Sequence, residues 1–294
     1  MKREAKADLS LLFVTMVWGI TFPIMSGILK YIPPFCLIAF RYIISAIIMG
    51  IIFYKKIVSI NLNVIRNSFY IGLTLFLGTA FQVVGLVYTT PSKSGFITGL
   101  NVVLVPIFMA LIYKKTPDTK TVTGVILSII GIAMISLDAN YGINKGDIYT
   151  MISAVAIALQ VIVVDKYAKN IDVISLTFIE FIIVGVFSLF PAVFVEKLNM
   201  ELNIVSIFSI LFMAIFCTII AYNIQNKMQP YTEPTHAAII FLGEPVFSAI
   251  FSAFIGDKLN GSALIGCAFI LISMIVININ YKMLKNFWFN KSSK

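Results

Sequence analysis

Three charged residues lie deep inside long apolar runs of the sequence, namely Arg41, Glu180 and Glu244. An ionised group in apolar surroundings is costly unless it is paired or solvated, so each side chain must face other polar groups. Pro245 follows Glu244 and lacks a backbone donor, which loosens a helix at that point. Glu244 is therefore the first candidate for binding a cation or proton. A structural carboxylate bonded to neighbouring helix backbone is the alternative.

Arg41 and Glu180 become equivalent positions when the chain is shifted by 139 residues. At 1.5 Å per residue, each falls about 10 Å inside its expected helix, measured from opposite faces of the protein. We therefore expect different depths and no direct salt bridge between them. Both are candidates for coupling or structural charges, and Glu180 is the next proton candidate after Glu244. The alternative is that each anchors its helix to a neighbour through hydrogen bonds.

Neutral polar and aromatic side chains in the apolar runs complete the candidate site. Trp18 and Phe22 are four residues apart and share a helix face, so they could form an aromatic wall for a flat or cationic solute, or simply pack. For the polar residues, hydrogen bonding between helices is the alternative to ligand contact. The candidate substrate-binding residues are Trp18, Phe22, Gln82, Asn101, Gln160, Tyr222 and Glu244, with Asn223 and Gln225 close to Tyr222.

The cysteines and the single histidine do not form a metal-binding pattern. Cys36, Cys217 and Cys267 all lie in apolar runs, without paired spacing for zinc or a disulfide. His236 begins an apolar run, where an interfacial residue is expected. We expect no cofactor and no metal.

The composition of the chain explains why these polar residues stand among so many apolar ones. Of 294 residues, 60% are hydrophobic and only 12% are charged, against about 25% charged in soluble domains. A helix crossing the bilayer needs about 20 apolar residues. The sequence predicts an all-α integral membrane protein with ten transmembrane helices at 9–29, 35–53, 68–88, 95–113, 121–137, 148–164, 173–195, 204–222, 235–255 and 263–281.

The basic residues orient these helices. With the N-terminus inside, the inner segments hold 16 Lys and Arg and the outer segments hold five, and Arg41 within a helix completes the 22. This asymmetry places both termini in the cytoplasm of a multi-pass protein of the cell (inner) membrane. The net charge of +9 thus indicates orientation and contact with membrane lipid, and we expect no nucleic-acid partner.

An internal repeat relates the two halves of the chain. The shift of 139 residues matches Thr79 to Thr218, Pro91 to Pro230 and Pro106 to Pro245, among others. We therefore predict two repeats, residues 1–138 and 139–294. Each holds five helices, an odd number, so the second enters the membrane in the opposite sense. Such inverted repeats are typical of secondary transporters with a midplane substrate site.

Several short motifs resemble a known family. They are Trp18-Gly19-x-x-Phe22, Phe40-Arg41-Tyr42, Gly85-Leu86-x-Tyr88-Thr89 and Gly243-Glu244-Pro245. Their order and spacing resemble EamA-type members of the drug/metabolite transporter superfamily, over nearly the whole chain. The resemblance implies a ten-helix fold with a central cavity lined mainly by helices 1, 3, 4, 6, 8 and 9, which moves metabolites such as amino acids by alternating access.

Small residues mark the last helix of each half. Gly124, Ser128 and Gly131 lie in one, and Gly261, Gly266 and Ser273 lie in the other. Small residues let helix backbones approach closely. By resemblance to four-helix relatives that dimerise through their last helix, we expect these two helices to pack together. The protein is then a monomer or a homodimer.

The predicted function is secondary transport of a small-molecule substrate, most simply the export of amino acids or related compounds. An importer of a vitamin, sugar or cationic solute is the alternative. A membrane-embedded enzyme is the rival class, but the sequence contains no His-Glu-x-x-His, no Gly-x-Ser-x-Gly and no phosphate-binding loop. Without a Walker motif, transport must draw on gradients.

Overall fold

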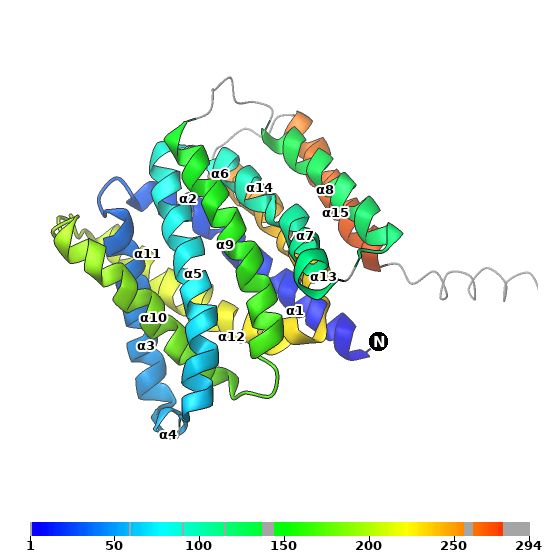
Figure 1. Ribbon diagram of the computed structural model, residues 1–294. Coiled ribbons are helices and arrows are strands. Elements are labelled where there is room, and N and C mark those ends of the chain that lie inside the picture. The colour runs from blue at the N-terminus through cyan, green and yellow to red at the C-terminus, as the bar shows by residue number, and fades with distance from the viewer. Residues whose placement is uncertain are drawn as a thin grey trace, which may run out of the picture.

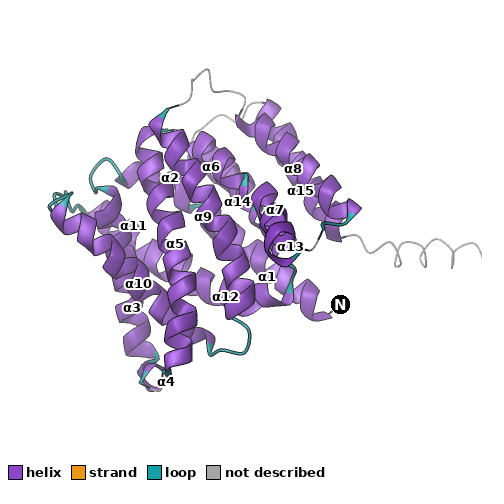
Figure 2. Ribbon diagram, in the orientation of Figure 1, coloured by secondary structure: helices purple, strands orange, loops and turns teal. Residues whose placement is uncertain are grey.

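The computed structural model describes residues 2–58, 60–89, 91–114, 116–136, 144–255 and 261–278. Within these ranges all regular structure is helical, as Figure 2 shows. The predicted all-α class is confirmed. The predicted repeat boundary at 138 and 139, and the predicted helix ends at Leu137 and Tyr281, lie outside the described residues.

Each of the ten predicted segments contains helix in the structure, but three of them are interrupted and a fourth changes helix type. The interruptions are at Ile20, Leu100 and Leu242. The helices are α1 (Lys2–Gly19), α2 (Thr21–Ile28), α3 (Pro34–Ile52), α4 (Tyr54–Ile57), α5 (Leu62–Tyr88), α6 (Pro91–Gly99), α7 (Asn101–Tyr113), α8 (Thr119–Ser136), α9 (Lys145–Tyr167), α10 (Val173–Phe194), α11 (Ile204–Phe212), the π-helix η1 (Met213–Ile220), α12 (Ala221–Met228), the short η2 (Gln229–Tyr231), α13 (Pro234–Phe241), α14 (Gly243–Ile255) and α15 (Gly261–Asn278).

Polar caps and prolines set where many of these helices begin. Asn61, Asn144, Asp172 and Asn203 each accept a hydrogen bond from the backbone three residues on, which satisfies an otherwise unpaired N–H. Proline starts α3, α6 and α13, where its missing donor is not needed. These starts agree with the turn residues in the sequence.

Six helical segments among the described residues are long and apolar enough to cross a membrane. They are Arg3–Ile28, Pro34–Ile52, Leu62–Tyr88, Lys145–Tyr167, Val173–Phe194 and Ile204–Tyr231. Shorter apolar helices occupy Ile97–Tyr113, Thr119–Met134 and Leu264–Val276. The chain is therefore a multi-pass membrane protein.

Helices α8 and α15 run side by side at one edge of the bundle (Figure 1). A Cβ on Gly131 would lie only 2.7 Å from the Gly266 carbonyl oxygen. Beside this contact, Ser128 Oγ donates to Ser273 Oγ at 2.9 Å. The expected packing of these two helices through small residues is what the structure shows.

The helix starts in the two halves of the chain are not separated by one constant number of residues. Helices α3 and α10 begin at residues 34 and 173, which are 139 apart. Helices α7 and α14 have 13 residues each and begin at 101 and 243, which are 142 apart. The difference arises because α10 has 22 residues and α3 has 19. Pro106 is the sixth residue of α7, whereas Pro245 is the third residue of α14.

Candidate functional site

The interrupted helices meet at their breaks. A Cβ on Gly99, beside the break at Leu100, would lie 3.2 Å from Leu242 Cδ2, at the break between α13 and α14. A Cβ on Gly19 would lie 2.6 Å from Phe247 Cβ and 3.0 Å from the Glu244 carbonyl oxygen. Glycine allows these crossings because it has no side chain to separate the backbones. The breaks in three segments therefore gather in one region of the bundle.

A cavity of about 80 Å³ lies in this region. It is large enough for several water molecules, and a metabolite would have to widen it. Residues of α1, α2, α3, α5, α6, α7, α9, α12, α13 and α14 line it. They are Trp18, Thr21, Met25, Arg41, Tyr42, Leu75, Thr79, Gln82, Thr98, Asn101, Ile157, Gln160, Val161, Tyr222, Gln225, Phe241 and Glu244.

The structure brings most of the predicted site residues to this cavity. Six of the seven candidate substrate-binding residues line it, and so does Arg41. Phe22 does not: its side chain is 2% exposed and packs in the apolar core. The i, i+4 relation to Trp18 runs across the break at Ile20, where the helix is interrupted. Glu180 is also absent from the lining. Asn223 does not line the cavity either, and its side chain donates a hydrogen bond of 2.8 Å to the Ile219 carbonyl oxygen.

Arg41 is held in place by the π-helix η1. Its Nε donates to Thr218 Oγ1 at 2.6 Å, and its Nη2 donates to the Cys217 carbonyl oxygen at 3.1 Å. Trp18 Nε1 donates to the same carbonyl at 3.0 Å. A π-helix alters the i→i−4 ladder and so changes which carbonyls are available, and such segments are frequent at functional sites. Arg41 thus has neutral acceptors on one side and the cavity on the other.

Arg41 and Glu244 both line the cavity, but they do not form a direct ion pair. Across the described ranges, neither forms an ion pair within 4.0 Å, and Glu244 accepts no hydrogen bond. Arg41 Nη1 likewise has no bonded partner in the part of the chain that the structure describes. Among the described residues, the cavity therefore presents one guanidinium and one carboxyl group that can each form further hydrogen bonds.

Four neutral side chains on the cavity lining can also form further hydrogen bonds. Their buried atoms without a hydrogen-bond partner in the described part of the chain are Thr98 Oγ1, Asn101 Oδ1, Gln160 Nε2 and Gln225 Oε1. All four residues are at most 6% exposed. Buried polar atoms are normally hydrogen-bonded, so a cluster of unpaired ones around a cavity indicates a place for water or a polar ligand.

An aromatic wall closes one side of the cavity, with a different partner from the one expected. The Trp18 ring lies 5.1 Å from the Tyr222 ring and 5.7 Å from the Phe241 ring, between centroids. Tyr222 in turn accepts a 3.3 Å hydrogen bond from the Tyr42 hydroxyl. Trp18 therefore joins aromatics of α12 and α13, in place of Phe22.

Sequence reasoning missed Tyr42, Thr79 and Thr98. For the two threonines a signal was present: Thr79 is three residues before Gln82, and Thr98 is three before Asn101. Residues at that spacing are neighbours on a helix surface. Tyr42 follows Arg41, and neighbouring residues do not share a helix face, so its position gave no such signal.

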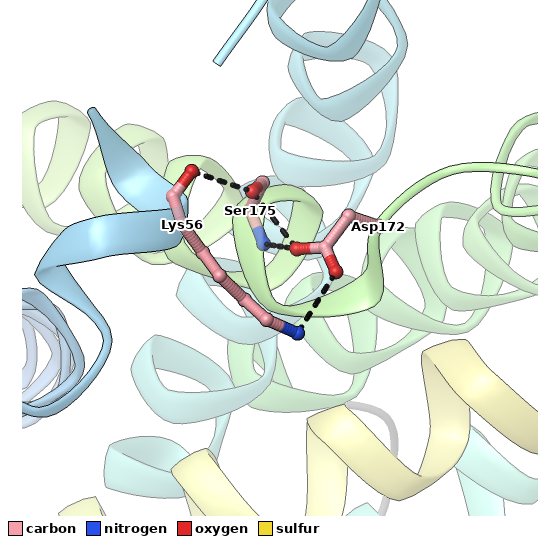
Figure 3. Close-up of polar contacts among 3 residues, drawn as sticks. All are labelled: Lys56, Asp172 and Ser175. Carbon is pink, nitrogen blue, oxygen red and sulfur yellow. Dashed lines mark hydrogen bonds and ion pairs between the residues drawn. The ribbon is translucent and has the colours of Figure 1, made fainter. Parts of the chain in front are cut away.

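A second polar cluster, shown in Figure 3, lies at the start of α10, and its residues do not line the cavity. Lys56 Nζ lies 3.3 Å from Asp172 Oδ1, and Asp172 Oδ2 accepts from the Ser175 backbone N–H and hydroxyl, at 2.9 Å each. Burial alone would raise the pKa of Asp172, but the hydrogen bonds from Ser175 and Lys56 outweigh it, and the pKa lies below its usual value. The cluster joins α4 to α10.

Together these features define a class: a helical membrane protein with a polar cavity between interrupted helices. The sequence model of the EamA-like transporter family matches residues 5–137 and 144–279. The chain belongs to this family.

Relatives with similar sequences carry transporter names. An "Uncharacterized transporter" of Archaeoglobus fulgidus is 33% identical over 274 residues, which cover 93% of this chain and 86% of the relative. The "Uncharacterized transporter YvbV" of Bacillus subtilis is 25% identical, over 96% of this chain and 94% of its own length. A solved crystal structure superimposes with a TM-score of 0.77 at 16% identity, over 93% of this chain and 96% of that one. At this identity the structure is evidence for the fold alone. The chain is a membrane transporter by family.

Proposed function

We propose that the protein is a secondary transporter that moves amino acids or related compounds through the cavity between its two halves by alternating access. In this proposal ten transmembrane helices form two inverted repeats of five, within residues 1–138 and 139–294. Two separate family matches, at 5–137 and 144–279, support the division. The equal lengths of α7 and α14, and of α8 and α15, support the repeat.

The observation that carries the substrate assignment is that a guanidinium and a carboxyl group, those of Arg41 and Glu244, line one cavity without an ion pair between them. An amino acid carries a carboxylate and an ammonium group. Guanidinium binds carboxylates with two parallel donors, and Arg41 Nη1 is free to take part. The ammonium group then faces Glu244 and the unpaired oxygens of Asn101 and Gln225. The remaining lining, including Leu75 and Val161, suits an aliphatic side chain.

A cationic solute is the second candidate. The rings of Trp18, Tyr222 and Phe241 lie together beside the cavity, and aromatic faces attract cations. Glu244 would complete such a site, and Arg41 would oppose it. A vitamin or sugar would instead use the neutral amides. Export is the proposed direction, and ion gradients are the proposed energy source.

The experiment measures which metabolites stabilise the purified protein. A ligand raises the melting temperature of the state that it binds. We expect zwitterionic amino acids to raise it, whereas the matching amides, which lack the carboxylate, do not. Stabilisation only by quaternary amines would favour the cationic candidate. Stabilisation by sugars alone would reject the assignment to Arg41 and Glu244.

The proposed orientation places both termini in the cytoplasm of the cell membrane, on the count of 16 inner to five outer basic residues. Lys145 and Lys114 fall on opposite sides in this topology, and both are exposed. In a protein without native cysteines, Lys145→Cys should react with an impermeant thiol reagent added outside, and Lys114→Cys should not. The reverse pattern would overturn the orientation.

A further inference from the structure

Glu180, on α10, is a carboxylate that the proposed substrate site does not use. Its side chain is fully buried, and it does not line the cavity. Oε2 accepts a 2.6 Å hydrogen bond from Asn226 Nδ2 on α12, and the same nitrogen lies 3.0 Å from Thr177 Oγ1. Among the described residues, Glu180 Oε1 and Asn226 Oδ1 are both buried without a hydrogen-bond partner. One Glu and one Asn therefore join two helices and leave two acceptors unsatisfied.

The groups facing Glu180 do not supply a positive charge. Helix α10 packs against α3, α5, α4 and α12. Arg41 of α3 is bonded to η1, and Lys56 of α4 is bonded to Asp172. The ionisable groups at the aromatic contact beside it are Tyr42 and Tyr222, whose rings both contact Phe181.

The other charged residues on these four helices are Lys55 of α4, Arg66 of α5 and Lys227 of α12, and all three are exposed. Within the described ranges, Glu180 forms no ion pair. An ionised carboxylate with one hydrogen bond and no counter-ion is strongly disfavoured in such a place. A neutral carboxylic acid is not disfavoured in this way. Its O–H group is a hydrogen-bond donor, whereas Glu180 Oε1 and Asn226 Oδ1 are both acceptors.

Asn226 connects this acid to the cavity. It lies on α12, which also carries Tyr222 and Gln225 of the cavity lining. Ionised Glu180 needs water or a cation, and either requires α12 to move from α10. A change at Glu180 therefore acts on the wall of the cavity through one short helix.

We propose that Glu180 is a proton-binding residue: its protonated form holds α12 against α10 in the conformation described here, and loss of the proton releases α12. No covalent step is involved, because the proton passes to water as the carboxylate is hydrated. The coupling of this proton to substrate movement rests on the proposed transport function, but the proton site itself does not.

The first test is an infrared pH titration of the full-length protein in lipid nanodiscs. A protonated carboxylic acid has a C=O stretching band that the carboxylate lacks. We expect this band at neutral pH in the wild type and in Glu244→Gln, and its loss in Glu180→Gln, which keeps the size of the neutral acid. A band that persists unchanged in Glu180→Gln, or that is absent from the wild type at neutral pH, overturns the proposal.

The Asn226→Ala variant keeps the test decisive if Glu180→Gln does not fold. In the proposal the proton on Glu180 and the contact with Asn226 are linked. Removal of the Asn226 amide should therefore shift the midpoint of the band's titration. An unchanged midpoint would mean that the titrating acid is not Glu180.

The release of α12 is tested separately by hydrogen exchange, corrected for the intrinsic effect of pH. Exchange in residues 221–228 should increase as the infrared band disappears in the wild type, and should not depend on pH in Glu180→Gln. Equal exchange in both proteins would overturn the link to α12. Because these measurements need no substrate, a failure of the transport proposal does not affect them.

Discussion

Arg41 on α3 donates a hydrogen bond of 2.6 Å from Nε to Thr218 Oγ1 on the π-helix η1. Thr218 Oγ1 donates in turn to the Met213 carbonyl oxygen at 2.9 Å. The hydroxyl thus accepts from a buried cation and donates to the altered helix ladder. This relationship fixes the guanidinium with one free nitrogen beside the cavity, as carboxylate binding in the proposed function requires.

Thr218→Val should therefore weaken the site without changing its volume. Loss of the hydroxyl leaves Arg41 Nε without an acceptor, and a buried unsatisfied group costs about 1–3 kcal/mol. We expect a lower melting temperature and weaker binding of amino acids. Thr218→Ser keeps the hydroxyl and serves as the control. Wild-type affinity in Thr218→Val would separate Arg41 from substrate binding.

Glu244→Gln should reduce the affinity for substrates that carry an ammonium group. A hydrogen bond to a charged group contributes about 1.5–3 kcal/mol, which corresponds to a change of about 10- to 100-fold in affinity. The variant should still fold, because Glu244 has no ion pair to lose within the described ranges. Calorimetric titration of the wild type and the variant with one amino acid and its deaminated acid measures the change. An equal loss for both ligands would show that Glu244 does not contact the amine.

The contact between α8 and α15 should be sensitive to one methyl group. In Gly131→Ala, the new Cβ would lie 2.7 Å from the Gly266 carbonyl oxygen, so the helices must separate. Overpacking of this kind costs about 1–3 kcal/mol. Gly27→Ala is the matched control, because a Cβ there meets nothing within 4 Å. Thermal unfolding in detergent should show a lower melting temperature for Gly131→Ala only; equal melting temperatures would argue against this close contact.

Asp172 should make stability depend on pH at the acidic end. Its pKa in the folded protein is below the usual value. The stabilisation is therefore complete above the unfolded pKa of about 3.9 and is lost as the pH falls through the lower folded value. The side chain is 43% exposed, so water screens it and the effect is below about 1 kcal/mol.

Two variants separate the contribution of the Asp172 charge to stability from that of its helix cap. Asp172→Asn can still cap α10 but has no charge, so it should remove the acid dependence and keep most of the stability. Asp172→Ala should also lose the cap, at a cost of about 1 kcal/mol. Unfolding followed between neutral and acidic pH measures both. Acid dependence that persists in Asp172→Asn would assign it to another carboxylate.

The helices could be predicted from the sequence because apolar runs and their punctuation are local properties. The same holds for the charged residues of the cavity, since Arg41 and Glu244 are conspicuous in apolar surroundings. Breaks within helices are harder to predict from the sequence than the helices themselves. The break at Leu242 lies beside Gly243 and Pro245, whereas Ile20 and Leu100 follow single glycines that also fit an unbroken helix.

Three features of the structure differ from what the sequence predicts. Phe22 was paired with Trp18 on a regular helix, and the interruption at Ile20 removes that basis. The shift of 139 residues predicts one constant spacing, whereas α3 and α10 begin 139 residues apart and α7 and α14 begin 142 residues apart. The π-helix that holds Arg41 has no sequence signal that we can identify.

The most direct test of the central claim is counterflow exchange in liposomes that contain the purified protein. Vesicles loaded with an unlabelled amino acid that stabilises the protein should accumulate the labelled form from outside without any ion gradient. Arg41→Gln and Asn101→Ala should each reduce this exchange at least about tenfold, since each removes a polar group from the cavity. Gly27→Ala should exchange as the wild type does. Exchange at the wild-type rate in both cavity variants would contradict the assignment of this cavity as the transport site.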